Sequence, residues 1–266
     1  MALAFLDKGP RKSDALLFFH GFMGRKEDWR AYVNKLNDTH RCLVPDLPGH
    51  GASVGLPPES YTMSGCAELV RQMLDTAGVE KVSPVGYSMG GRFALYFAVT
   101  FPGYVERLVL VSASPGLAEE AERRARIQHD EKLAQRLEAE GMASFLNDWY
   151  RQPVFASLAD RPEIVRQLRS DREQQDPIEL AKSLRGMGTG VQPSLWDRLP
   201  ELPMPVLVLA GEKDGKFVAI ARRMVDLCPR AELCIIPACG HMPHREQPEV
   251  FHRRLVQFIG DDNRSE

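Results

Sequence analysis

The chain has 266 residues and a formal net charge of −2, with 44% hydrophobic and 26% charged residues. This is the composition of an ordinary globular protein, and its charge gives no basic field for nucleic acid or anionic membranes. No apolar run approaches the roughly twenty residues that a membrane helix needs, and a charge follows too early at the N-terminus for a signal peptide. The five cysteines form no CxxC pair, which favours buried thiols in a reducing compartment. We therefore expect a cytoplasmic protein, monomeric, with no nucleic-acid or membrane partner.

The first part of the chain alternates apolar runs with amphipathic stretches. Strands are predicted at residues 15–19, 41–44, 82–85 and 108–111. Helices are predicted at 29–36, 61–77 and 91–101, and Gly78 is expected to end the second of them. Such alternation predicts an α/β fold with a mostly parallel central sheet and helices on both faces.

The alternation stops after Pro115. Residues 117–199 show no strong strand signal and are charged and helical in pattern. Strands then resume at 206–209 and 233–236, with helices at 218–227 and 248–258. We interpret 1–115 and 201–266 as two parts of one core and 116–200 as an inserted helical cap. The cap is expected over the carboxyl ends of the strands, where open α/β sheets place their ligand crevice.

The most informative motif is Gly86-x-Ser88-x-Gly90, which lies between a predicted strand and a predicted helix. A strand, a sharp turn and a helix form the context that a nucleophile elbow requires, and small residues at 86 and 90 permit the turn. A plain glycine-rich loop is the alternative. The position favours Ser88 as a catalytic serine.

A serine needs a histidine to take its proton and an acid to orient that histidine. In the chain order Ser…Asp…His, Asp214 follows the strand at 206–209 and His241 lies in the loop after 233–236. Ser88, Asp214 and His241 are therefore the predicted triad, with Glu212 and His244 as weaker alternatives. His241-x-x-His244 has no further ligands clustered nearby, so no metal is expected.

An oxyanion hole needs two backbone N–H groups aimed at one point. One should come from Met89, which follows the serine. The other is expected from Phe22, in the loop 20–24 after the first strong strand. A simple tight turn is the alternative explanation of His20-Gly21.

Several segments carry a family resemblance. Segments 20–22, 46–51, 86–92 and 239–241 resemble the α/β-hydrolase superfamily. Segments 112–117, 148–155, 188–196 and 211–217 resemble, more specifically, the 2-succinyl-6-hydroxy-2,4-cyclohexadiene-1-carboxylate synthases, which are pyruvate-eliminating lyases of menaquinone biosynthesis. The resemblance covers nearly the whole chain, including the cap. Met242 departs from it, because an Asn often follows the histidine in that family.

The resemblance implies a substrate with three carboxylates, which guanidinium groups bind in a bidentate manner. In the predicted helix at the start of the cap, Arg126 shares a face with Leu133 and Leu137, whereas Arg123 and Arg124 point elsewhere and suit solvated charge. The substrate-binding residues expected from the family are Tyr87, Arg92, Arg126, Trp149, Arg169 and Lys216.

The resemblance also implies a mechanism without cofactor or metal. Ser88, activated by His241, would remove a ring proton beside the succinyl ketone, and the N–H groups of Phe22 and Met89 would stabilise the ketone oxygen. Two other functions remain open at this stage. One is a carboxylesterase or carbon–carbon bond hydrolase that uses the same triad, and the other is a non-catalytic ligand-binding protein.

Overall fold

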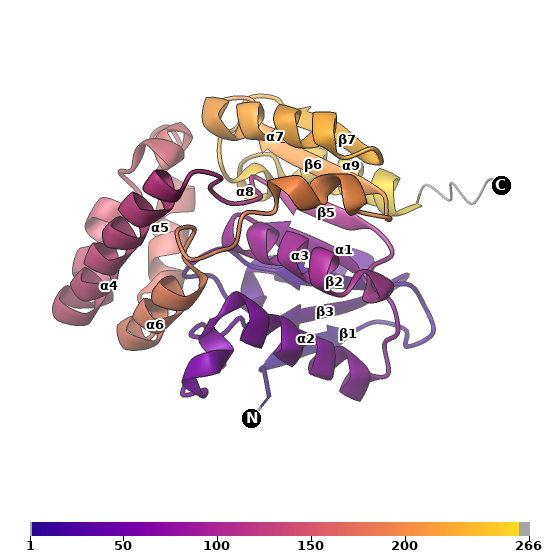
Figure 1. The fold of residues 1–266 in the computed structure, drawn as a ribbon, viewed down its shortest axis with the longest axis horizontal. Helices are drawn as coiled ribbons and strands as arrows, with labels where there is room; N and C mark the ends of the chain where they lie inside the picture. Colours follow the sequence, from indigo (N-terminus) through magenta and orange to yellow (C-terminus); the bar gives the residue numbers. More distant parts are fainter. Residues whose placement is uncertain (1, 261–266) are drawn as a thin grey trace.

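The computed structural model describes residues 2–260, which form a seven-stranded sheet with helices on both faces (Figure 1). The strand order is β1-β3-β2-β4-β5-β6-β7. The strands are β1 Phe5–Lys8, β2 Ala15–Phe19, β3 Arg41–Pro45, β4 Ser83–Tyr87, β5 Leu108–Val111, β6 Val206–Gly211 and β7 Ala231–Ile236. Neighbouring strands pair in parallel, except that β1 runs antiparallel to β3 at the edge. The predicted mostly parallel α/β sheet is confirmed.

Helices cover the two faces of the sheet and form two separate cores. One core receives side chains from α2 (Met63–Ala77), α3 (Met89–Thr100) and α7 (Gly215–Leu227). The other receives them from α1 (Arg30–Leu36) and α9 (Pro248–Gly260). Short helices complete these regions: η1 Lys26–Trp29, η2 Pro58–Tyr61, η3 Pro102–Tyr104, η5 Trp196–Glu201 and α8 Pro243–Glu246.

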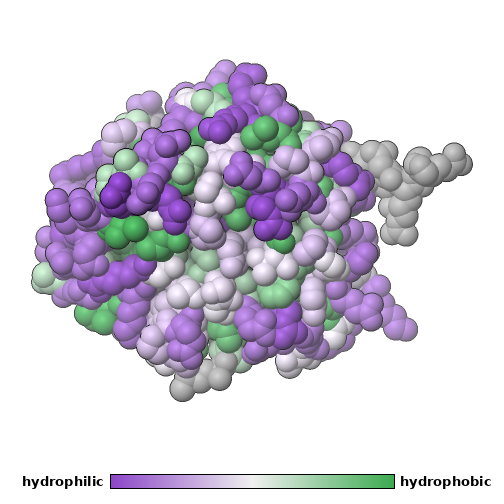
Figure 2. Space-filling model, viewed as in Figure 1, coloured by the Kyte–Doolittle hydropathy of each residue, from purple (hydrophilic) through white to green (hydrophobic). Residues whose placement is uncertain are grey.

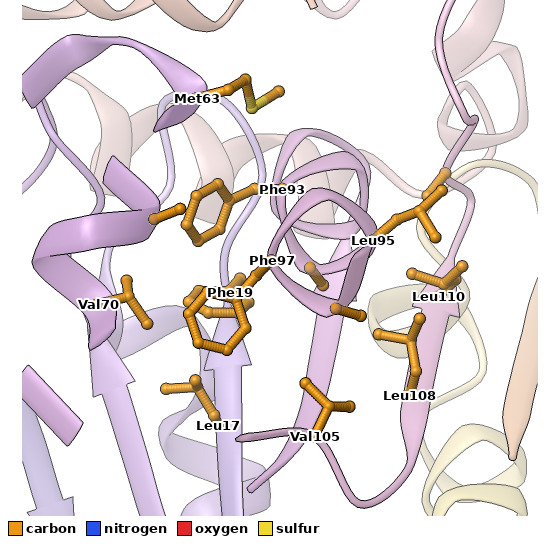
Figure 3. Close-up of a cluster of buried hydrophobic side chains, with 14 of the residues drawn as sticks. Leu17, Phe19, Met63, Val70, Phe93, Leu95, Phe97, Val105, Leu108 and Leu110 are labelled. Atoms are coloured by element: carbon orange, nitrogen blue, oxygen red, sulfur yellow. The ribbon is translucent and has the colours of Figure 1, made fainter. Parts of the chain in front are cut away.

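The packing of α3 on the sheet fixes the part of the core nearest the serine. Figure 3 shows Leu17 and Phe19 of β2 on the same side of the sheet as Phe93 and Phe97 of α3. The Phe19 and Phe93 rings meet edge to face with centroids 4.9 Å apart, a geometry that aromatic pairs prefer. All five residues of β2 are buried, as expected for an uninterrupted apolar strand with both faces covered.

Between β5 and β6 the chain contains helices and no strand; residues 112–205 are all described. These helices are α4 (Glu120–Trp149), η4 (Pro153–Leu158), α5 (Pro162–Arg172), α6 (Pro177–Met187) and η5. The helices α4, α5 and α6 lie together at one end of the molecule (Figure 1). Apolar side chains of α4 and α6 form a third cluster with Met23 of the 20–24 loop. The helical character of this segment agrees with the sequence pattern, while the domain boundaries at 116 and 200 stay a prediction.

The surface is mostly polar. Figure 2 shows hydrophilic residues over most of one face, with small apolar areas between them. None of the helices in residues 2–260 is long and apolar enough to cross a membrane. The five cysteines are free thiols, and all except Cys234 are buried, in agreement with the expectation of buried thiols.

The end of α2 allows a direct test of how the sequence determines a helix boundary. Gly78 lies in the left-handed region with φ 66° and ψ 41°, and a Cβ added there would meet no atom within 4 Å. Gly78→Ala therefore introduces backbone strain alone, and we expect it to lower the free energy of unfolding by about 1–2 kcal/mol. The matched control is Gly103→Ala, at an equally open site without a positive φ. Equal urea midpoints for the two variants would contradict the assignment of Gly78 as the helix terminator.

Candidate active site

The turn between β4 and α3 places Ser88 at the carboxyl edge of the sheet. Ser88 has φ 50° and ψ −110°, a conformation that non-glycine residues rarely adopt. A Cβ at Gly86 would lie 2.3 Å from the Gly90 carbonyl oxygen, and a Cβ at Gly90 would lie 2.4 Å from the carbonyl oxygens of Phe19 and His20. The turn therefore requires glycine at both positions, which explains the spacing of the motif.

Three strand ends bring Ser88, His241 and Asp214 into one hydrogen-bonded chain. His241 Nε2 lies 3.1 Å from Ser88 Oγ, and His241 Nδ1 lies 2.7 Å from Asp214 Oδ2. Asp214 also caps α7, because its Oδ1 accepts a hydrogen bond from the Phe217 N–H at 3.4 Å. With Nδ1–H donated to the buried carboxylate, Nε2 is free to accept the serine proton. The arrangement suits proton transfer from or to Ser88.

The two alternative residues weighed for the triad, Glu212 and His244, lie outside these hydrogen bonds. Glu212 is exposed and accepts a hydrogen bond from the Ala238 N–H at 3.0 Å. His244 is buried between the rings of Trp29 and Tyr87, at centroid distances of 5.0 and 4.4 Å. Burial lowers the pKa of His244 to about 3, so its imidazole is neutral at physiological pH.

The loop that carries His241 is held from both sides by one buried carboxylate. Glu246 Oε2 accepts a hydrogen bond from the Gly240 N–H at 3.0 Å, and Glu246 Oε1 accepts one from the Met242 N–H at 3.1 Å. The Phe217 ring packs edge-on against the imidazole of His241, with centroids 4.6 Å apart. Glu246 was not anticipated from the sequence, and it fixes the backbone on either side of the histidine.

The 20–24 loop lies against the serine turn. The Leu47 N–H donates to His20 Nε2 at 3.0 Å, so Nδ1 carries the proton and donates to the Gly21 carbonyl at 2.8 Å. Burial lowers the pKa of His20, which keeps this neutral tautomer. Met89 begins α3, and the first N–H groups of a helix have no acceptor within it. The oxyanion-hole roles of Phe22 and Met89 remain predictions that this arrangement allows.

A small cavity of about 40 Å³ lies beside Ser88. Its lining includes the predicted residues Phe22, Tyr87 and Trp149 together with Asp28 and Arg172, which were not predicted. Arg172 donates to both carboxylate oxygens of Asp28, at 2.8 Å for the Nη1–Oδ1 contact. Burial raises the pKa of Asp28, but the charge and hydrogen bonds of Arg172 outweigh it and the pKa is lowered. A buried guanidinium thus faces the cavity in an ion pair.

Comparison with known proteins identifies this architecture. Residues 14–248 match the α/β hydrolase fold family. A Bacillus subtilis (strain 168) protein is 39% identical over 258 residues, covering 96% of this chain and 94% of that protein. The 2-succinyl-6-hydroxy-2,4-cyclohexadiene-1-carboxylate synthase of Serratia proteamaculans (strain 568) is 33% identical, covering 97% of this chain and 98% of that protein.

The chain belongs to the α/β-hydrolase fold family and, within it, to the 2-succinyl-6-hydroxy-2,4-cyclohexadiene-1-carboxylate synthases. Solved structures agree. MenH from S. aureus has a TM-score of 0.92 and 36% identity, covering 98% of both chains. A thermophilic esterase from Thermogutta terrifontis, solved with malate bound, has a TM-score of 0.84 and 27% identity, covering 97% of this chain and 93% of that chain.

Two of the arginines predicted from the synthase family approach each other across the core and the cap. Arg92 of α3 donates to Gln192 Oε1 at 2.6 Å and to the Met187 carbonyl at 3.0 Å. Arg126 of α4 donates to Asp130 Oδ1 at 2.7 Å. Burial, and then the nearby charge of Arg126, lower the pKa of Arg92 to about 10. The two groups are neighbours, and neither lines the cavity beside Ser88.

The other predicted cationic residues lie outside that cavity. Arg169 packs on α4, where Nη2 donates to Asn147 Oδ1 at 2.7 Å, and Lys216 is exposed above the Phe217 ring. Arg172 lines the cavity and was not predicted, whereas the substrate-binding role of Arg169 stays a prediction. The apolar phase of α5 could have revealed this, because Arg172 follows the buried Leu168 by four residues and shares its face.

Two further expectations concern the cap and metals. Arg123 is not fully solvated but half-buried, with Nε 3.5 Å from the Gly190 carbonyl; the packing of the 188–191 segment on α4 is the reason. In residues 2–260 no cluster of three His, Cys, Asp or Glu side chains could hold a metal ion.

The role of Glu246 gives a stability prediction. In Glu246→Gln, an amide NH₂ faces a backbone N–H, so a buried donor loses its acceptor. We expect the free energy of unfolding to fall by about 1–3 kcal/mol. Glu249→Gln is the control, since Glu249 is exposed and its carboxylate pairs with Lys35 at the surface. Indistinguishable urea denaturation curves for the two variants would rule out this role of Glu246.

Proposed function

We propose that the chain is a lyase that eliminates pyruvate from 2-succinyl-5-enolpyruvyl-6-hydroxy-3-cyclohexene-1-carboxylate to give 2-succinyl-6-hydroxy-2,4-cyclohexadiene-1-carboxylate. The observation that carries the chemistry is the hydrogen-bonded chain from Ser88 through His241 to Asp214. Membership of the synthase family supports the choice of substrate. The partner is thus a small polycarboxylate.

The first step is a proton transfer. His241 accepts the hydroxyl proton of Ser88 at Nε2, and Ser88 Oγ removes the ring proton beside the succinyl ketone. Asp214 stabilises the imidazolium that forms. The elimination needs no acyl transfer to Ser88, so the triad works as a general base.

The second step is the departure of the leaving group. The electron pair of the broken C–H bond first delocalises onto the ketone oxygen, where the N–H groups of Met89 and Phe22 would donate to it. When this electron pair returns from the ketone oxygen to the ring, the existing ring double bond shifts by one position. The carbon–oxygen bond to the enolpyruvyl group then breaks. The departing enolate becomes pyruvate by taking up the proton that the His241 imidazolium holds, which restores the neutral histidine.

Guanidinium groups supply the complementary charge for the substrate. Arg172 faces the cavity beside Ser88, and Arg92 and Arg126 lie together between core and cap. Charged, bidentate donors of this kind hold carboxylates in a fixed orientation. We assign substrate carboxylates to Arg92 and Arg126, with Tyr87 and Trp149 as walls of the site; Arg172 is already paired with Asp28.

The cavity beside Ser88 is small. Its volume of about 40 Å³ is below the 300–1,000 Å³ or so typical of small-molecule sites, and we propose that the site widens when the substrate binds.

The base assignment predicts the effect of removing the hydroxyl. Ser88→Ala should lower kcat for pyruvate release by about a hundredfold or more, because positioned proton transfer contributes about 10²–10⁴-fold. Pyruvate is measured by coupling to lactate dehydrogenase, and the melting temperature shows that the variant is folded. A variant that kept more than about a tenth of the wild-type kcat would exclude Ser88 as the base.

A hydrolase on the same triad is the competing function, because the esterase from Thermogutta terrifontis shares the fold at 27% identity. We expect slow cleavage of neutral p-nitrophenyl esters and efficient pyruvate release. Fast, repeated ester turnover with no pyruvate released from the cyclohexene substrate would favour the hydrolase instead.

The arginine assignment is tested with two residues of the same helix. Arg126→Ala should lower kcat/KM by about ten- to a hundredfold, the loss expected for a hydrogen bond to a charged group. Arg124→Ala should change little, because Arg124 is exposed and pairs only weakly with Glu120 at 3.7 Å. Steady-state pyruvate release measures both. Equal kinetics for the two variants would exclude Arg126 from substrate binding.

A further inference from the structure

The guanidinium groups near the site differ in how their charge is compensated. Arg172 is neutralised by Asp28, with which it forms two hydrogen bonds. Arg92 and Arg126 have one carboxylate between them, Asp130, and it is hydrogen-bonded to Arg126. One carboxylate beside two guanidinium groups leaves a net positive charge, and Arg92 is the guanidinium of the two without a hydrogen bond to that carboxylate.

Arg92 is held by neutral groups only. Its hydrogen-bond acceptors are the side-chain oxygen of Gln192 at 2.6 Å and the Met187 carbonyl at 3.0 Å. Gln192 has no exposed surface. A buried carboxylate at position 192 would satisfy Arg92 far better than an amide does, because charge-assisted hydrogen bonds are roughly twice as strong as neutral ones. The amide therefore leaves the charge of Arg92 available.

The orientation of the Gln192 amide is determined by Arg92. A guanidinium can only donate hydrogen bonds, so Oε1 must face it and Nε2 must point away. Within the described residues, Gln192 Nε2 is buried and has no acceptor. A buried amide NH₂ without an acceptor is costly, and it is explained if a ligand supplies the oxygen.

Hydrogen bonds fix the backbone around Gln192. The Gln192 N–H donates to the Gly188 carbonyl at 3.1 Å, and the Leu195 N–H donates to the Pro115 carbonyl at 2.8 Å. Trp196 Nε1 donates to the Gly116 carbonyl at 3.0 Å. These bonds attach the segment 188–196 to Pro115 and Gly116, which follow β5. Arg92 itself lies one helical turn after Ser88, because its N–H donates to the Ser88 carbonyl.

We propose that Gln192 determines specificity for an anionic substrate: its amide oxygen orients Arg92 without neutralising it, and its Nε2 donates to the same substrate carboxylate. This inference rests on the proposed lyase function for the identity of the substrate. It adds a residue from the end of the cap to the arginines, and it explains why a neutral side chain occupies that position.

The test compares substitutions that separate charge from shape. Gln192→Glu keeps the acceptor for Arg92 but cancels its charge and removes the Nε2 donor. We expect KM for the cyclohexene substrate to rise about ten- to a hundredfold, with kcat changed much less. Gln192→Met removes both hydrogen-bonding groups without adding charge, and its KM should rise less than that of Gln192→Glu.

The matched control is Gln174→Glu. Gln174 lies on the exposed surface of the cap and its side-chain oxygen also accepts from an arginine, Arg25, at 3.3 Å. The same chemical change there should leave KM and kcat close to wild type. Melting temperatures show whether each variant is folded. If Gln192→Glu does not fold, the proposal is tested by whether KM rises in Gln192→Met.

A binding measurement separates this inference from the proposed function. Isothermal titration with tricarballylate, a small tricarboxylate, should show weaker binding to Gln192→Glu than to wild type or Gln174→Glu. If wild type releases no pyruvate, the lyase function is excluded, and the titration alone then decides whether Gln192 contributes to carboxylate binding. If Gln192→Glu binds tricarballylate and the substrate as tightly as wild type, or if Gln192→Met is the more damaging change, the inference is overturned.

Discussion

The tight turn at Ser88 is the constraint from which the rest of the site follows. Gly90 packs directly on the carbonyl oxygens of Phe19 and His20, so the turn that raises the serine also fixes the start of the 20–24 loop. His20 then donates a hydrogen bond to the Gly21 carbonyl, beside the Phe22 N–H that we assign to the oxyanion hole. The serine and that loop are therefore one packing unit, and the strained backbone of Ser88 is maintained by the surrounding sheet.

Polar contacts join the start of α6 to the core beside the apolar cluster in which Met23 packs on α4 and α6. Gln175 accepts a hydrogen bond from the Gly51 N–H and donates to the carbonyls of Met23 and Gly24. Together with the Asp28–Arg172 ion pair, these contacts attach the junction of α5 and α6 to the loops beside the serine.

The local patterns predicted most of the core, and the tertiary contacts explain what they missed. Apolar runs and glycine spacing predicted the central strands, the helix end at Gly78 and the serine turn, because each depends on neighbouring residues. The short edge strand β1 was not predicted, because it is defined by antiparallel pairing with β3, which lies far away in sequence. The contact of Arg172 with the cavity was not predicted, because its partner Asp28 lies 144 residues away in sequence. Gln192 was seen only as part of a motif for the same reason.

The central claim is that this triad removes a proton and does not form an acyl-enzyme. The most direct measurement is the rate of pyruvate release from substrate deuterated at the ring position beside the succinyl ketone, with the intact mass of the protein recorded during turnover. The account predicts slower release from the deuterated substrate and an unmodified protein mass. Equal rates for both substrates, together with a covalent adduct on Ser88, would contradict it.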